Sequence, residues 1–109
     1  MAHRELTDFE LMILLAILRI GDDAYGVPVA REIERMAGRS TLFGVIYTAL
    51  DRLEKNGLVT SFYGDPTPER GGRAKRFFNV TSKGLKAVKD AKRPFTLSIR
   101  IPELKGGTA

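Results

Sequence analysis

The sequence predicts a mainly α fold with one small β-hairpin. Three stretches before residue 58 place apolar side chains at the three- and four-residue spacing of an amphipathic helix. Residues 58–63 and 76–81 are instead rich in β-branched and aromatic residues, and the loop between them contains Pro and Gly. The length of 109 residues suits a single domain, and a hydrophobic share of 43% is typical of a folded chain.

The first helix is expected over residues 8–20. Thr7 and Glu10 stand at the spacing of a capping box, in which each side chain accepts a hydrogen bond from the backbone N–H of the other. Residues 11–18 read LMILLAIL, which is far below the roughly 18 to 20 apolar residues of a membrane span. We therefore expect a buried helix and no membrane partner. Because this stretch is apolar on every side, it is also a candidate contact between two copies of the chain.

Two more helices are expected before residue 58. Gly26 and Pro28 mark the start of the second helix, because Pro suits a first helical turn, and Gly38 marks its end. Ser40 and Thr41 are the capping candidates for the third helix, which begins near residue 45 and stops at residues 56–57. The apolar stripe of the third helix consists of Ile46, Ala49, Leu50 and Leu53.

A fourth, short helix is expected after the hairpin. Thr81 or Ser82 can cap its start, Leu85 and Val88 are expected to point inward, and Pro94 ends it. Three helices, a two-stranded wing and a short C-terminal helix form a winged helix-turn-helix domain. We expect this DNA-binding domain over residues 1–93. Residues 94–109 form a C-terminal tail whose alternating pattern makes it a candidate strand or dimerisation segment.

The net charge of +5 is concentrated in one part of the chain. Residues 62–93 carry nine basic and three acidic side chains, whereas residues 1–61 carry seven basic and nine acidic side chains. A basic region on an otherwise balanced domain is the electrostatic footprint of a protein that binds nucleic acid. Double-stranded DNA is therefore the expected partner.

The exposed face of the third helix is the candidate surface for reading DNA. A helix in the major groove contacts base edges mainly with its N-terminal half, while nearby hydroxyls and basic groups hold phosphates. Asp51 opposes this role, because it would face a polyanion, and a merely solvated polar face is the alternative. The candidate contacts are Ser40, Thr41, Tyr47, Thr48 and Arg52.

The loop between the two strands is the candidate wing. Its sequence PERGGRAKR combines adjacent glycines, which permit a tight turn, with cations that can follow phosphates or enter a minor groove. A solvated hairpin whose charges only discourage edge association is the alternative. Neither the P-loop pattern nor the dinucleotide-binding glycine pattern fits, so a nucleotide site is not expected. The DNA-binding candidates are Arg70, Arg73, Lys75 and Arg76.

Few residues are available for catalysis. The chain has no cysteine and one histidine, His3, so a histidine-based triad, a thiolate site or a two-histidine metal site cannot form within one chain. We predict that the protein is not an enzyme and that it has no catalytic residue, cofactor or metal. The N-terminus lacks the pattern of a signal peptide, which favours a cytoplasmic location.

Three segments resemble motifs of the PadR family of bacterial transcriptional regulators: Tyr25-Gly26, residues 44–59 and residues 71–84. The matching positions are Gly44, Tyr47, Leu50, Leu53, Glu54, Gly57 and Leu58 in the helix region, and Gly72, Arg73, Arg76, Phe78, Val80, Thr81 and Gly84 in the wing. The resemblance implies a homodimeric DNA-binding regulator, usually a repressor. It adds Gly44 to the candidate contacts and implies that Tyr47 and the wing arginines lie near the phosphate backbone.

The resemblance is incomplete at the C-terminus. Members of the family generally carry a long C-terminal helix that mediates dimerisation and often lines an effector pocket, whereas this chain has only a short helix before Pro94. A small-molecule effector is therefore left undecided. The sequence predicts a sequence-specific transcription factor, with a winged-helix protein-interaction module as the alternative, because such folds also serve as docking domains.

Overall fold

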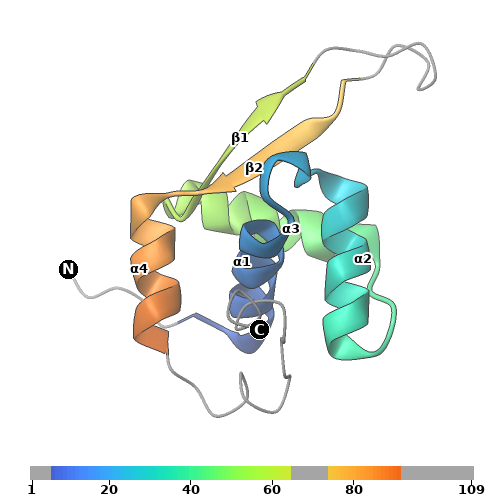
Figure 1. Ribbon diagram of the computed structural model, residues 1–109, viewed down its shortest axis with the longest axis horizontal. Helices are drawn as coiled ribbons and strands as arrows, with labels where there is room; N and C mark the ends of the chain where they lie inside the picture. The colour runs from blue at the N-terminus through green and yellow to red at the C-terminus, as the bar shows by residue number, and fades with distance from the viewer. Residues whose placement is uncertain (1–5, 65–73, 92–109) are drawn as a thin grey trace.

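The computed structural model describes residues 6–64 and 74–91 (Figure 1). These residues form four α-helices, one short 3-10 helix and one antiparallel hairpin. The elements are α1 (Asp8–Ile20), η1 (Gly21–Asp23), α2 (Gly26–Ala37), α3 (Phe43–Lys55), β1 (Val59–Tyr63), β2 (Arg76–Val80) and α4 (Ser82–Ala91). The predicted order of helices and strands is confirmed. The tail expected over residues 94–109 lies outside the described residues.

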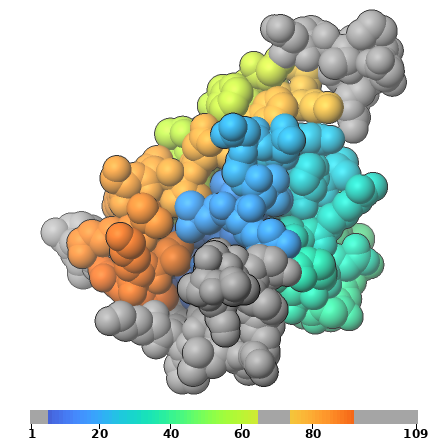
Figure 2. Space-filling model, in the orientation of Figure 1, coloured from blue at the N-terminus to red at the C-terminus, as the bar shows by residue number. Residues whose placement is uncertain are grey.

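Helix α1 is the central helix of the fold. Its start is capped as predicted, since the Glu10 N–H donates to Thr7 Oγ1 over 3.0 Å and the Thr7 N–H donates to Glu10 Oε1 over 2.9 Å. Helices α2, α3 and α4 and strand β2 all contact α1, and Figure 2 shows α1 between α2 and α4. Most apolar side chains of its 11–18 stretch are buried by the rest of the subunit, whereas Leu18 is 38% exposed. The packing within the subunit accounts for most of the apolar surplus of α1, and a dimer contact through this helix stays a prediction.

The hydrophobic core lies where the first three helices meet the hairpin. Helix α3 buries the predicted stripe, and α2 adds two β-branched side chains. Strand β2 contributes one aromatic ring to the same cluster. The largest fully buried side chains are Leu11, Ile13, Leu14, Val29, Ile33, Ile46, Leu50, Leu53, Val59 and Phe78, together with Glu10.

The turn between α2 and α3 differs in one detail from the sequence expectation. Gly38 ends α2 with a φ of 76°, a left-handed conformation that Gly adopts without steric cost. Leu42 then occupies the N-cap of α3, and no side chain caps that helix. The prediction that Ser40 or Thr41 is the cap is wrong, because Ser40 reaches back to α2 and donates its hydroxyl to Glu34 Oε2 over 2.6 Å.

The hairpin extends away from the helices and rests on them at its base (Figure 1). Its register pairs Val59 with Val80, Ser61 with Phe78 and Tyr63 with Arg76. Side chains alternate between the two faces of a strand, so these six residues share one face. The Phe78 N–H also donates to the Ala24 carbonyl over 2.8 Å, which attaches β2 to the segment before α2.

Helix α4 packs on the hairpin through a glycine. Thr81 caps the helix as predicted, since its Oγ1 accepts from the Gly84 N–H over 3.0 Å. A Cβ at Gly84 would lie 2.2 Å from the Leu58 carbonyl oxygen, so the two backbones approach closely there. This contact fixes the rotation of α4 and leaves Leu85 39% exposed. The prediction that Leu85 points inward is therefore wrong, whereas Val88 packs against the core as expected.

Candidate nucleic-acid interface

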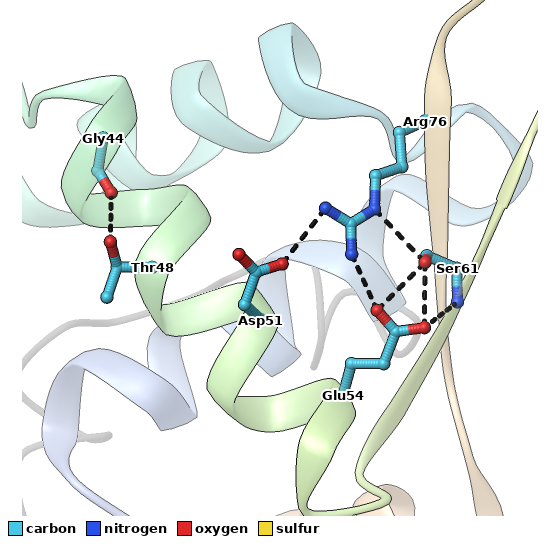
Figure 3. A network of polar contacts seen from close by, with 6 residues as sticks. All are labelled: Gly44, Thr48, Asp51, Glu54, Ser61 and Arg76. Atoms are coloured by element: carbon cyan, nitrogen blue, oxygen red, sulfur yellow. Dashed lines mark hydrogen bonds and ion pairs between the residues drawn. The ribbon is translucent and has the colours of Figure 1, made fainter.

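Helix α3 presents a stripe of small and polar residues on its exposed side. Gly44, Thr48 and Asp51 follow one another at four- and three-residue spacing and lie along one side of the helix in Figure 3. The Thr48 hydroxyl donates to the Gly44 carbonyl over 2.8 Å, which leaves the hydroxyl oxygen exposed as an acceptor. Apart from its chain neighbours and the backbone of α3 itself, a Cβ at Gly44 would meet no atom within 4 Å. Another molecule can therefore approach the backbone of α3 closely at Gly44.

The N-terminus of α3 is open to an anion. Its N-cap residue, Leu42, makes no side-chain hydrogen bond to the first turn. The Val45 N–H of the first turn donates to the Leu42 carbonyl over 3.1 Å. The earliest N–H groups of an uncapped helix have no carbonyl one turn before them, and the helix dipole favours negative charge beside them. A phosphate group is one ligand that such a helix end can hold.

Arg76 of β2 connects the hairpin to α3. Its Nη1 lies 3.1 Å from Asp51 Oδ1, and its Nη2 lies 2.7 Å from Glu54 Oε1. Its Nε donates to Ser61 Oγ over 3.2 Å, and Ser61 in turn donates to the Glu54 carboxylate (Figure 3). Hydrogen bonds from Ser61, with those from Arg76, hold the pKa of the Glu54 carboxyl below its ordinary value.

This network changes the charge that α3 presents. One cation lies between two carboxylates, so the negative charge of Asp51 is partly neutralised beside the polar stripe. The Arg76 side chain is only 22% exposed, and its guanidinium also lies 4.9 Å from the centre of the Phe78 ring. The sequence predicts Arg76 as a cation on the extended wing. In the structure its guanidinium instead pairs with the Asp51 and Glu54 carboxylates of α3. A direct contact between Arg76 and DNA stays a prediction.

Tyr47 is half-buried between α2 and the hairpin. Its ring centre lies 6.3 Å from those of both Phe43 and Phe78, and burial raises the pKa of its hydroxyl. A Cβ at Gly26 would lie 2.1 Å from the Tyr47 hydroxyl oxygen. The end of the tyrosine side chain therefore packs directly on the Gly26 backbone, and this contact gives a structural reason for the glycine of the Tyr25-Gly26 pair. The contact of Tyr47 with phosphates stays a prediction.

The other candidate residues are placed in different ways. Arg52 Nε lies 3.1 Å from Oε2 of Glu10, a carboxylate that is buried beneath α3. Lys75 Nζ lies 4.4 Å from the centre of the Tyr25 ring. Thr41 is partly exposed in the turn before α3. The wing residues Arg70 and Arg73 lie outside the described residues, and their contacts with DNA stay predictions.

Sequence reasoning missed an apolar surface at the start of α3. Leu42, Phe43 and Val45 are 76%, 49% and 49% exposed, and they border an open groove of about 720 Å³. Phe9 of α1 and Thr48 and Arg52 of α3 line the same groove. The sequence does contain a pattern that indicates this surface, because Val45 is a large apolar residue outside the buried stripe of its helix.

Other kinds of site are missing from the described part of the chain. Over residues 6–64 and 74–91, no three acidic, histidine or cysteine side chains lie close enough together to hold a metal ion. Within the same ranges, no helix has the length and apolar character that crossing a bilayer requires. The surface of α3 and the hairpin therefore remains the candidate site.

Comparison with known proteins agrees with this architecture. The family model described as transcriptional regulator PadR-like family matches residues 14–90. The chain is similar to a transcriptional regulator from Clostridium thermocellum, with a TM-score of 0.63 and 27% identity over 82% of this chain and 81% of that chain. It is also similar to the hsRosR-SG complex structure, with a TM-score of 0.67 and 28% identity over 96% of this chain and 88% of that chain.

A more distant structure shares the fold. The PadR family transcription regulator from Clostridium difficile R20291 has a TM-score of 0.62 at 21% identity, over 94% of this chain and 98% of that chain. With the four helices and the hairpin, these likenesses confirm the predicted winged helix-turn-helix fold. No curated protein sequence matches the chain.

Proposed function

Because the chain belongs to the transcriptional regulator PadR-like family, we propose that it regulates transcription by binding double-stranded DNA with sequence specificity through α3 and the hairpin. The family consists of transcriptional regulators and not of enzymes. The observation that carries the proposal is the exposed stripe on α3, where Gly44 leaves room for a ligand and Arg76 neutralises the neighbouring carboxylates. Because its carboxylates are partly neutralised and its backbone is accessible at Gly44, α3 can approach the polyanionic DNA duplex.

Within this proposal, α3 lies in the major groove with its N-terminal half deepest. Thr48 is placed to contact a base edge, and the first turn of α3 is placed to hold a phosphate. Ser40 and Thr41 flank that turn and would position the protein on the backbone. Arg52 is held by Glu10 through one nitrogen, so its remaining N–H groups can reach a phosphate.

The hairpin is proposed to add affinity more than specificity. Arg70, Arg73 and Lys75 would contact phosphates, whose arrangement hardly varies with sequence. Arg76 has a different proposed role, because it holds the hairpin against α3 and neutralises Asp51 and Glu54. In this proposal, Arg70, Arg73 and Lys75 attract the DNA phosphates, whereas Arg76 places the wing correctly against α3.

We further propose a cytoplasmic homodimer that acts as a repressor. A single winged helix contacts one half-site, and tight specific binding generally needs a second copy related by a two-fold axis. The tail over residues 94–109 is the proposed dimerisation segment, since most apolar side chains of α1 are buried within their own subunit. Repression would follow if the dimer covers a promoter, and no effector is proposed.

Salt-dependent duplex binding tests the proposed function against the protein-interaction alternative. We expect the affinity for a mixed pool of duplexes to fall steeply as salt rises, because bound phosphates release counterions. About six phosphate contacts would lower the affinity by about 10³-fold between about 50 and 200 mM salt. The measurement is fluorescence anisotropy of a labelled duplex at several salt concentrations. A protein that serves only as a docking module would show no saturable duplex binding at any of them.

A further inference from the structure

Three large apolar side chains stand exposed around the first turn of α3, and we infer that two of them, Leu42 and Val45, read the C5 methyl groups of thymine in the operator. The three are Leu42, Phe43 and Val45, called here the Leu42 patch. The inference rests on the proposed function and extends it to a class of base contact. It predicts which chemical group of the operator the protein recognises.

The position of the patch argues for a ligand. Val45, Thr48 and Arg52 follow at three- and four-residue spacing, so an apolar residue stands in line with two polar candidate contacts. All three of these residues line the groove that Leu42 and Phe9 also border. The N-terminal half of a recognition helix is the part that enters the major groove deepest. The Leu42 patch therefore lies where base edges are expected.

DNA fits the surroundings of the patch better than a second copy of the chain. Three polar groups lie around the patch: the uncapped first turn of α3, the exposed Thr48 hydroxyl oxygen and the Arg52 side chain. A DNA duplex offers phosphates and base edges as partners for all three groups. A close apolar contact between two protein chains would bury these polar groups, which costs free energy unless each finds a partner. The backbone at Gly44 is also open to close approach.

The chemistry of the major groove narrows the contact to one group. Of the four bases, only thymine presents an apolar group there, its C5 methyl, whereas the other recognition groups are hydrogen-bond donors and acceptors. Aliphatic side chains have no donor or acceptor to offer those groups. Leu42 and Val45 are therefore assigned to thymine methyls. The ring centre of Phe43 lies 6.3 Å from that of Tyr47, so this third residue packs on its own helix and borders the contact.

Thymine-to-uracil substitution tests this inference, because it removes the methyl and leaves every hydrogen-bonding group of the base. A duplex that the protein selects from a random pool is resynthesised with each thymine replaced in turn by deoxyuridine. We expect the wild-type protein to bind about three- to fivefold more weakly for each contacted methyl that is removed. Val45→Ala and Leu42→Ala should each lose this sensitivity at one position. The change to Ala favours an exposed helix, so Val45→Ala should stay folded.

Leu85→Ala is the matched control, because Leu85 is also an exposed apolar residue but lies on α4. It should keep the full sensitivity to uracil. Tight and specific binding that no uracil substitution weakens would overturn this inference and leave the proposed function standing. Failure to bind any duplex would overturn both. A change in molar mass by light scattering in Val45→Ala, with uracil sensitivity retained, would overturn it in favour of a contact between two chains.

Discussion

Gly84→Ala is expected to destabilise the protein by about 3 kcal/mol, which corresponds to a fall in Tm of roughly 10 to 20 °C. The added Cβ would lie 2.2 Å from the Leu58 carbonyl oxygen and 2.8 Å from Val80 Cγ1. A backbone oxygen cannot turn aside as a flexible side chain can, so α4 must move off the hairpin. Urea denaturation measures the loss as a lower midpoint at an unchanged slope.

Gly44→Ala is the matched control, since Gly44 is also a helical glycine. Open space surrounds the position of its Cβ, and Ala favours a helix by up to about 1 kcal/mol over Gly. The variant should therefore be as stable as the wild type or slightly more stable. Its affinity for DNA should nevertheless fall about tenfold, since the methyl would stand between α3 and the duplex. Equal stability of the Gly44 and Gly84 variants would contradict the described packing of α4.

Arg76→Met is expected to weaken DNA binding by about 30-fold, or about 2 kcal/mol. The methionine keeps an apolar stem beside Phe78 but exposes the charges of Asp51 and Glu54 to the duplex. Like charges brought together at an interface repel each other strongly. Fluorescence anisotropy with the selected duplex gives the affinity, and urea denaturation verifies that the variant is folded.

A triple variant separates neutralisation from a direct phosphate contact. If Arg76 acts by neutralising the carboxylates, adding Asp51→Asn and Glu54→Gln to Arg76→Met should restore most of the affinity. If Arg76 instead binds a phosphate, the triple variant should stay as weak as the single variant, and the salt slope should fall by about one unit. Lys86→Met is the control, because it removes an exposed cation paired with Asp90 on α4 and should change the affinity little.

The helices were predictable because their signals are local. The capping box at Thr7 and Glu10 places the start of α1, and the buried stripe from Ile46 to Leu53 identifies α3 by its period alone. Gly38 ends α2 because its conformation suits glycine. Each of these features depends on residues within a few positions of one another, which is the range over which a sequence pattern reports structure.

The errors at Leu85 and Arg76 arise where distant segments meet, whereas the wrong cap prediction at Ser40 has a local cause, its bond to Glu34. The orientation of Leu85 depends on the close approach of Gly84 to the Leu58 carbonyl, which no helical period reveals. The partner of Arg76 is Glu54, which is 22 residues away along the chain and reaches it only through the register of the hairpin. The sequence pattern of a basic residue beside a glycine-rich loop does not distinguish a solvated side chain from one that forms an ion pair. Family motifs supplied both Arg76 and Glu54, but not the contact between them.

The central claim is that this chain reads DNA sequence through α3, and selection of bound sequences from random duplex DNA tests it most directly. The wild-type protein should enrich one sequence, arranged as an inverted repeat with two half-sites related by the two-fold axis of the dimer. Thr48→Ala, in parallel, should enrich a repeat whose base preference is relaxed at one position of each half-site. Enrichment of no sequence by the wild-type protein, despite measurable duplex binding, would contradict the claim.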